Sequence, residues 1–189
     1  MCGRFLIDED VSSALDLMVP GWEQLSFAFK FGTIYPSMPC IVITQKNGRL
    51  SCAVLPFGYR SESMNKLIIN ARAETASEKR MFAYAWKHAR CAVPASLFYE
   101  WTPDKQKISF TQPDGRPMYL AALAIDEQFV ILTRPADSYV APYHHRMPVI
   151  LEQDQVASWI FNEAEAHQLI ENAKPILNAS GAFRQTTLF

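Results

Sequence analysis

Short apolar stretches bounded by turn residues recur along the chain, and this pattern predicts β-strands in most of it. Strands are expected at 40–44, 50–56, 67–70, 91–94, 97–101, 108–111, 117–124, 128–134 and 147–151. Asn47-Gly48 and Asp114-Gly115 tolerate the positive φ angles of tight turns. We therefore predict one hairpin that joins 40–44 to 50–56 and a second that joins 108–111 to 117–124.

Helical spacing occurs in fewer places. Behind Asp8, a candidate N-cap, apolar residues follow at helical intervals and Pro20-Gly21 then ends the helix: Val11, Ala14, Leu15 and Met18. A second helix is expected over about 77–88, burying Met81, Phe82, Ala85 and Trp86. Two more helices, about 153–161 and 163–173, close the chain. Asn162 and Glu165 form a capping-box pattern at the start of the last one.

The remaining segments, at 22–38, 60–66 and 135–146, are predicted to be irregular. Many strands with few β-α-β alternations favour an α+β fold built on mixed or antiparallel sheet. At 189 residues, with no internal repeat, linker or low-complexity tract, the chain is expected to form one domain over 1–189.

The composition excludes several classes of protein but does not identify the function. The net charge of −1 argues against a broadly basic, non-specific nucleic-acid binder, but it allows a local basic groove. No apolar run approaches the roughly 20 residues of a membrane span, and no signal peptide is readable. The four cysteines contain no Cys-x-x-Cys pair, so no metal site is expected, and a cytoplasmic protein with reduced thiols fits best. Cys40, Cys52 and Cys91 lie in apolar stretches and are expected to pack in the core.

Cys2 stands directly behind the initiator methionine, where a small side chain permits removal of Met1. The mature chain would then begin with an amine and a thiol on adjacent carbons. Reference pKa values of roughly 7.7–8.0 and 8.5 leave both groups partly deprotonated near neutrality. Such an aminothiol can condense with an aldehyde and close a five-membered thiazolidine ring.

Three further segments place polar groups beside apolar strands. Glu100, flanked by three aromatic residues, is paired, exposed at the strand end, or a desolvated carboxyl suited to general acid catalysis. His144 is either a surface loop residue or a proton carrier, and spacing does not separate it from His145. Asn70 could simply cap the following turn. The arginines of these segments, Arg72 and Arg146, are by default solvated or paired with Glu74 and Glu78.

Together these segments resemble the SRAP family, the SOS response-associated peptidase proteins that sense abasic sites in single-stranded DNA. The resemblance is carried by four motifs that follow in the family's order: Met1-Cys2-Gly3-Arg4-Phe5, Ile69 to Thr75 (INARAET), Arg90 to Ala95 (RCAVPA) followed by Phe98-Tyr99-Glu100-Trp101, and His144 to Pro148 (HHRMP). It spans residues 2 to about 151.

The resemblance implies an α+β fold with a barrel-like core of mixed or antiparallel sheet and flanking short helices. It also implies catalytic roles for four residues: Cys2, Asn70, Glu100 and His144. Cys2 would form a covalent thiazolidine crosslink with the opened abasic sugar, Asn70 would hold the N-terminal residue, and Glu100 and His144 would move protons. DNA contacts would come from Gly3, Arg4, Arg72, Trp101 and Arg146.

The resemblance further implies a DNA-damage (SOS) role that shields the lesion, and no cofactor or metal. The partner would be single-stranded DNA with abasic sites, not a membrane. A monomer in the cytoplasm or at the nucleoid is expected. The family's peptidase, hydrolase or lyase classification reflects autoproteolytic release of residues ahead of the cysteine, and here only Met1 stands ahead of it.

The chain departs from the family pattern at three places. Phe57-Gly58 replaces the usual Trp-Gly, and the loop 60–66 lacks an aromatic wedge. Thr33 to Pro36 (TIYP) lacks a supporting Asn, and His145 stands where an acid is usual. The missing wedge bears on which DNA structure around the lesion is preferred, and His145 implies a different pairing partner for His144 or Arg146.

Two other functions fit the same residues. A cysteine hydrolase would use Cys2 as nucleophile and His144 as base. A binding module would hold single-stranded or junction DNA through Arg4, Arg72 and Arg146 without chemistry. A stable DNA adduct distinguishes the crosslinking function from both.

Overall fold

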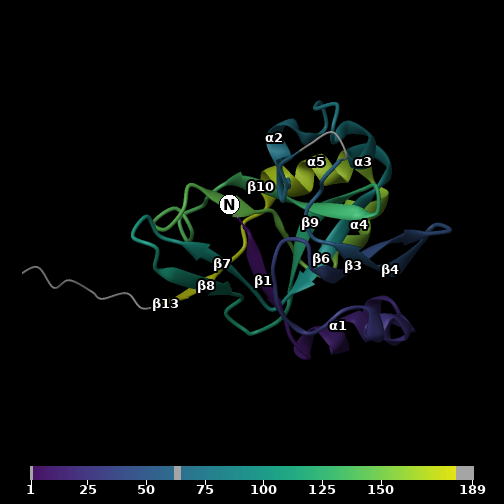
Figure 1. The fold of residues 1–189 in the computed structure, drawn as a ribbon, viewed down its shortest axis with the longest axis horizontal. Helices are drawn as coiled ribbons and strands as arrows, with labels where there is room; N and C mark the ends of the chain where they lie inside the picture. Colours follow the sequence, from purple (N-terminus) through teal and green to yellow (C-terminus); the bar gives the residue numbers. More distant parts are fainter. Residues whose placement is uncertain (1, 62–64, 182–189) are drawn as a thin grey trace, which may run out of the picture.

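The computed structural model describes residues 2–61 and 65–181, which form two β-sheets with short helices around them (Figure 1). The smaller sheet has five strands, in the order β13 (Asn178–Gly181), β8 (Lys107–Thr111), β7 (Leu97–Trp101), β1 (Arg4–Ile7) and β2 (Gly32–Ile34). All its neighbouring strands are antiparallel.

The larger sheet has eight strands and contains most of the core. Its main path runs β11 (Arg146–Pro148), β10 (Gln128–Pro135), β9 (Met118–Ile125), β6 (Arg90–Ala95), β3 (Pro39–Lys46) and β4 (Arg49–Pro56). Off this path, β12 (Ile150–Leu151) pairs with β9, and β5 (Asn70–Arg72) pairs in parallel with β10. The predicted α+β class with mixed sheet is confirmed. Within the described residues both sheets are open, so the term barrel-like applies only loosely.

The helices are short and lie at the edges and on one side of the larger sheet (Figure 1). They are α1 (Asp10–Met18), the 3-10 helix η1 (Trp22–Ala28), α2 (Ala73–Ala76), α3 (Ala83–His88), α4 (Gln155–Phe161) and α5 (Glu163–Asn172). None of the helices in the described ranges is long and apolar enough to cross a membrane.

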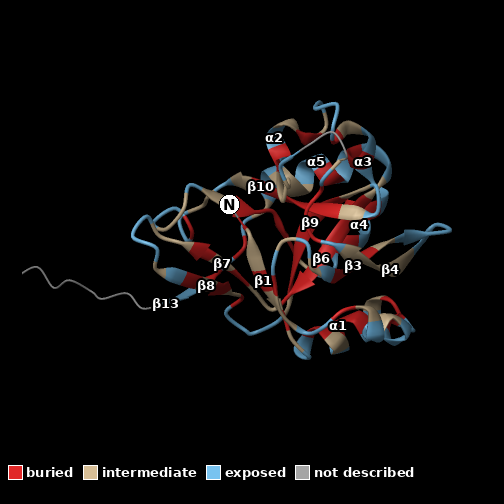
Figure 2. Ribbon diagram, in the orientation of Figure 1, coloured by how far each residue is buried: buried red, intermediate tan, exposed pale blue. Residues whose placement is uncertain are grey.

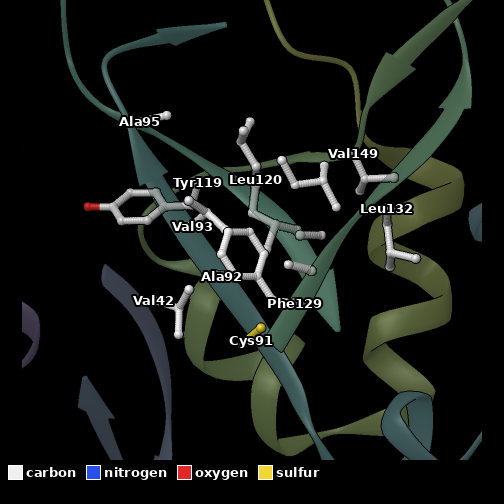
Figure 3. Close-up of a cluster of buried hydrophobic side chains, with 14 of the residues drawn as sticks. Val42, Cys91, Ala92, Val93, Ala95, Tyr119, Leu120, Phe129, Leu132 and Val149 are labelled. Carbon is white, nitrogen blue, oxygen red and sulfur yellow. The ribbon is translucent and has the colours of Figure 1, made fainter. Parts of the chain in front are cut away.

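One buried cluster joins the two sheets, as the burial colouring of Figure 2 shows around β1, β6, β9 and β10. The ring of Phe5 on β1 packs edge-on against Phe57, with 5.3 Å between centroids. Phe57 in turn stacks on Phe129 of β10 at 5.2 Å. Figure 3 shows Phe129 among apolar side chains of β6 and β9, including Cys91 and Leu120. Cys40 and Cys91 are buried and Cys52 is half-buried, consistent with packing roles.

Several local predictions are confirmed. Asn47-Gly48 joins β3 to β4, with φ angles of 54° and 73°. The Asn162 side chain accepts the N–H groups of Ala164 and Glu165, which confirms Asn162 as the N-cap of α5. The Glu165 carboxylate accepts from the Asn162 side-chain amide and not from its backbone N–H, so only half of the predicted capping box forms. The first helix begins at Asp10 with Glu9 as its N-cap, so Asp8 is not the N-cap that the sequence predicted, although its carboxylate accepts the Asp10 N–H at 3.2 Å.

The predicted hairpin between 108–111 and 117–124 is wrong. Gly115 does occupy a turn, with φ of 72°, but the chain crosses there from one sheet to the other. Strand β8 pairs with β7, where Phe110 stacks on Phe98 at 4.8 Å. Strand β9 is buried on both faces from Met118 to Leu123, and it lies between β6 and β10. A strand buried on both faces fits the middle of a sheet better than the side of a half-exposed hairpin.

The single helix predicted over 77–88 is also wrong. The structure has two short helices, α2 and α3, because backbone hydrogen bonds between them close turns on Thr75 and Lys79. Phe82, Ala85 and Trp86 are buried as predicted, but Met81 is 37% exposed. Met81 precedes the apolar face, which begins at Phe82.

Two arginines hold the carboxyl ends of three helices. Arg90 is 4% exposed, and its guanidinium donates to the carbonyls of Trp86 in α3 and of Trp159 and Ile160 in α4. Arg134 donates to the carbonyls of Ile170 and Ala173 at the end of α5. Helix carboxyl ends leave carbonyls without intrahelical donors, and a cation there is favourable. These contacts fix the helices against β6 and β10.

Candidate active site

Cys2 lies just ahead of β1 and is fully buried. Its thiol is 3.9 Å from the Arg4 carbonyl oxygen, a long and weak contact. Burial raises the pKa of the Cys2 thiol, and the charge of Glu100 raises it further. Both effects favour the protonated form of the thiol.

Glu100 is placed by the alternation of β7. Phe98 and Glu100 point inward and are buried, whereas Tyr99 and Trp101 lie on the other face. Glu100 is 2% exposed, so it is not the exposed strand-end residue that the sequence also allowed. Burial raises its pKa, and the nearby charge of His145 acts in the opposite direction. A carboxyl with a raised pKa can act as a general acid near neutrality.

Asn70 connects the larger sheet to the N-terminal segment. It begins β5, and its side-chain amide donates to the carbonyl of Cys2 at 3.1 Å and to that of Ile131 in β10 at 3.4 Å. Cys2 is therefore held by a group from the opposite sheet, and Asn70 does more than cap a turn. Its catalytic role stays a prediction.

His144 and His145, which spacing could not separate, differ in the structure. The Nδ1 atom of His144 is 3.0 Å from the Arg146 amide nitrogen and 2.9 Å from the Arg146 carbonyl oxygen. Burial lowers the pKa of His144, which favours the neutral imidazole. His145 is exposed and stacks on His144, with 4.4 Å between ring centroids. Its pKa is lowered chiefly by the charge of His144.

Arg146 is tied into the protein. Its guanidinium makes a two-point ion pair with Glu74, at 2.5 and 2.8 Å, and donates to the carbonyl of Thr133 at 2.5 Å. This ion pair lowers the pKa of Glu74. Since the Arg146 backbone also bonds His144, the Glu74–Arg146 pair fixes the histidine segment against β10. Pairing with Glu74 is one of the two default states that the sequence allowed for Arg146.

The other predicted DNA contacts lie toward the surface. The Arg4 guanidinium sits between two rings, 4.8 Å from that of Tyr35 and 4.7 Å from that of Trp101. Gly3 is partly exposed and Arg72 is exposed. Tyr35 was missed in the sequence because it lies in an irregular segment without periodicity; its place before Pro36 was the only signal.

Of the two departures from the family's aromatic pattern, the structure describes Phe57 fully and the loop 60–66 only in part. Phe57 is buried between Phe5 and Phe129, so its ring is not available to stack on a base. Residues 62–64 of the loop that lacks a wedge lie outside the described residues. Among the described residues, no cluster of three or more His, Cys, Asp or Glu side chains could hold a metal ion.

The family model and the curated relatives that match this chain point to the same family. The model of the family "SOS response associated peptidase (SRAP)" matches residues 1–184. The abasic site processing protein YedK of Escherichia coli is 26% identical over 92% of this chain and 85% of its own length. YoqW of Bacillus subtilis, also an abasic site processing protein, is 27% identical over 85% of this chain and 80% of its own.

Solved structures share the fold. A phage-related protein from Bordetella bronchiseptica superimposes with a TM-score of 0.77 at 22% identity, covering 97% of this chain and 95% of that one. A protein from Bacteroides thetaiotaomicron gives a TM-score of 0.76 at 22% identity over 97% and 93% of the two chains. With the family model matching nearly the whole sequence, the chain belongs to the SOS response associated peptidase (SRAP) family.

Proposed function

We propose that this protein captures abasic sites in single-stranded DNA by forming a covalent bond through Cys2. The family and the names of the curated relatives support an abasic-site substrate. The observation that carries the chemistry is the junction of Cys2, Glu100 and Asn70: the thiol is buried within the electrostatic reach of a buried carboxyl, and the Cys2 carbonyl is held by an amide.

The reaction begins once Met1 has been removed. The α-amine of Cys2 attacks the aldehyde carbon of the opened deoxyribose and gives a carbinolamine. Glu100, with its raised pKa, protonates the departing hydroxyl, and water leaves as the imine forms. The Cys2 sulfur then adds to the imine carbon while its proton passes to the nitrogen. The net change is aldehyde plus aminothiol to thiazolidine plus one water.

The pKa directions suit this order of steps. Burial and the charge of Glu100 raise the pKa of the Cys2 thiol, which disfavours a thiolate and is consistent with the amine attacking before the sulfur. After donating its proton, the Glu100 carboxylate can accept the thiol proton and relay it. The neutral imidazole of His144 can assist the same transfers. A cysteine hydrolase instead needs a thiolate in the resting enzyme, and the raised pKa of Cys2 disfavours that alternative.

For the DNA backbone, we assign phosphate contacts first to Arg4 and Arg72, with Gly3 allowing close approach and Trp101 contacting a base. The Arg146 guanidinium is already bound by Glu74, so it would reach a phosphate only by leaving that pair. Its first role in this proposal is to hold the histidine segment.

The crosslink would shield the lesion from strand cleavage during the DNA-damage response, at the nucleoid or in the cytoplasm, with the protein acting as a monomer.

The test is Cys2→Ala, with Cys52→Ala as the matched control because Cys52 is a half-buried cysteine on β4. Protein lacking Met1 is incubated with a single-stranded oligonucleotide that carries one abasic site, and adducts are resolved under denaturing conditions. Cys2→Ala should form no stable adduct yet retain salt-sensitive binding, while Cys52→Ala should react normally. An undiminished adduct with Cys2→Ala would refute the assignment of Cys2.

A further inference from the structure

We propose that the outward face of the smaller sheet is a binding surface for the nucleotides that flank the lesion on one side. This surface, called the outer ladder, consists of Tyr35, Arg4, Trp101, Tyr99 and Lys107. The inference rests on the proposed function. It goes beyond that function by assigning DNA contacts to Tyr35, Tyr99 and Lys107 and by giving the flanking strand a path.

Strand register places the ladder on one face. Arg4 of β1 is paired with Tyr99 of β7, and Trp101 of β7 is paired with Lys107 of β8. Residues paired across antiparallel strands project to the same side, as do residues two apart in one strand. The opposite face carries Phe98 and Glu100, which are buried. β1, β7 and β8 lie side by side in Figure 1.

The five side chains form a continuous series of contacts in which rings and cations meet. Arg4 lies between Tyr35 and Trp101, and Trp101 is 6.4 Å from Tyr99 between ring centroids. The Lys107 ammonium lies 3.7 Å from the centroid of the Tyr99 ring. Lys107 and Tyr35 are exposed, and Arg4, Tyr99 and Trp101 are partly exposed.

The charge of the ladder is positive and uncompensated by ion pairs. Within the described residues, neither Arg4 nor Lys107 forms an ion pair with an Asp or Glu. The acid in the turn between β7 and β8, Asp104, accepts hydrogen bonds from Thr102 and Gln106 of the same turn. The ladder is therefore a local basic strip on a protein whose net charge is −1.

Single-stranded nucleic acid suits this strip better than a duplex or an acidic peptide. Proteins that bind single strands combine aromatic side chains, on which bases stack, with cations that track the backbone. The ladder offers three rings for bases and two cations for phosphates. It also adjoins the reaction site along the chain, because Arg4 follows Cys2 by two residues and Trp101 directly follows Glu100. A strand whose abasic sugar reaches Cys2 can thus continue over Trp101 toward Tyr99 and Lys107.

The experiment uses the double variant Tyr99→Ala/Lys107→Ala and two oligonucleotides with the lesion near the 5′ end or near the 3′ end. The flanking nucleotides then extend in only one direction from the lesion. At subsaturating protein, the variant should crosslink about tenfold more slowly than wild type with one of the two oligonucleotides, a difference of about 1.4 kcal/mol. With the other oligonucleotide, the variant and wild type should crosslink at the same rate. The two proteins should also react at the same rate with either oligonucleotide when the DNA is saturating.

Tyr84→Ala/Lys87→Ala is the matched control, because it removes an exposed tyrosine and lysine from α3. A milder variant, Lys107→Gln, guards against misfolding. It should lower the slope of log affinity against log salt for lesion-free single-stranded DNA by about 0.7, the loss of one phosphate contact. Equal crosslinking rates for the two double variants, together with an unchanged salt slope for Lys107→Gln, would overturn the proposal.

Failure of the proposed function would look different. In that case wild-type protein forms no adduct with any abasic oligonucleotide. The salt-dependent binding of lesion-free DNA by wild type and Lys107→Gln still tests the ladder, since that measurement involves no covalent chemistry.

Discussion

The ionisation of Glu100 is set by its burial in the fold and not by its residue type alone. At an exposed strand end its carboxyl would ionise in water, but the inward phase of β7 buries it. The sequence left burial and exposure both open for Glu100, because three neighbouring aromatic residues fit either state. The strand phase, set by pairing Tyr99 with Arg4, decides between them.

Burial of Glu100 predicts a pH-dependent stability. Its folded-state pKa is raised, so its contribution to stability is fully present below the unfolded pKa of about 4.3 and is lost as the pH rises through the folded value. Glu100→Gln should therefore match wild type at acid pH and exceed it by a few °C in Tm at pH 8, where about 1 kcal/mol corresponds to ~2–4 °C.

Thermal unfolding of both proteins across this pH range measures the difference. Glu171→Gln, at an exposed position on α5, is the control and should show no such trend. The same Glu100→Gln variant should crosslink about 10²–10⁴-fold more slowly, the usual contribution of a general acid. A Tm difference that shrinks as the pH rises would contradict the burial argument.

Asn70 gives a second prediction at this scale. Its amide joins the Cys2 carbonyl to β10 through two hydrogen bonds. Asn70→Ala should lower the single-turnover crosslinking rate by about 10²-fold, because a small misplacement of the nucleophile is costly. It should cost about 1 kcal/mol in stability. Asn65→Ala, an exposed loop change, is the matched control. If both variants react at the same rate, Asn70 does not position Cys2.

At the scale of elements, the sequence predicts correctly those features that depend only on neighbouring residues. The Asn47-Gly48 turn and the Asn162 N-cap depend on neighbouring residues, and both are as predicted. Pairing over a distance was not readable: Asp114-Gly115 looks like a hairpin turn, yet it carries the chain between two sheets. Likewise, the apolar spacing predicts a helix from Ser77, whereas α3 begins at Ala83.

Arg90 gives the prediction at the scale of elements. Its guanidinium joins the ends of α3 and α4 by three hydrogen bonds to carbonyls. Arg90→Met should lower the free energy of unfolding by about 2–4 kcal/mol, because buried carbonyls lose their donors. Arg90→Lys should be intermediate, since one ammonium cannot match the fork of a guanidinium.

Urea unfolding measures these changes, with Arg49→Met on the exposed end of β4 as control. A midpoint for Arg90→Met equal to that of the control would show that the arginine contributes no stability to this junction.

For the whole molecule, the site depends on how two sheets meet. The smaller sheet supplies Cys2 and Glu100, the larger supplies Asn70, and a loop before β11 supplies His144. The ring contacts of Phe57 with Phe5 of β1 and Phe129 of β10 join the two sheets. The sequence motifs identified these residues through resemblance. They could not show that Arg146 is bound by Glu74 or that Arg4 lies between two rings, because both contacts join segments far apart in the chain.

The most direct test of covalent capture is the intact mass of the product. Protein confirmed to lack Met1 is mixed with a single-stranded oligonucleotide carrying one abasic site, and the product is weighed after denaturation. We expect an adduct whose mass is the sum of protein and DNA less one water, with the modification on Cys2 after digestion, and no adduct with the lesion-free oligonucleotide. No adduct, or an adduct on another residue, would contradict capture of the lesion by Cys2.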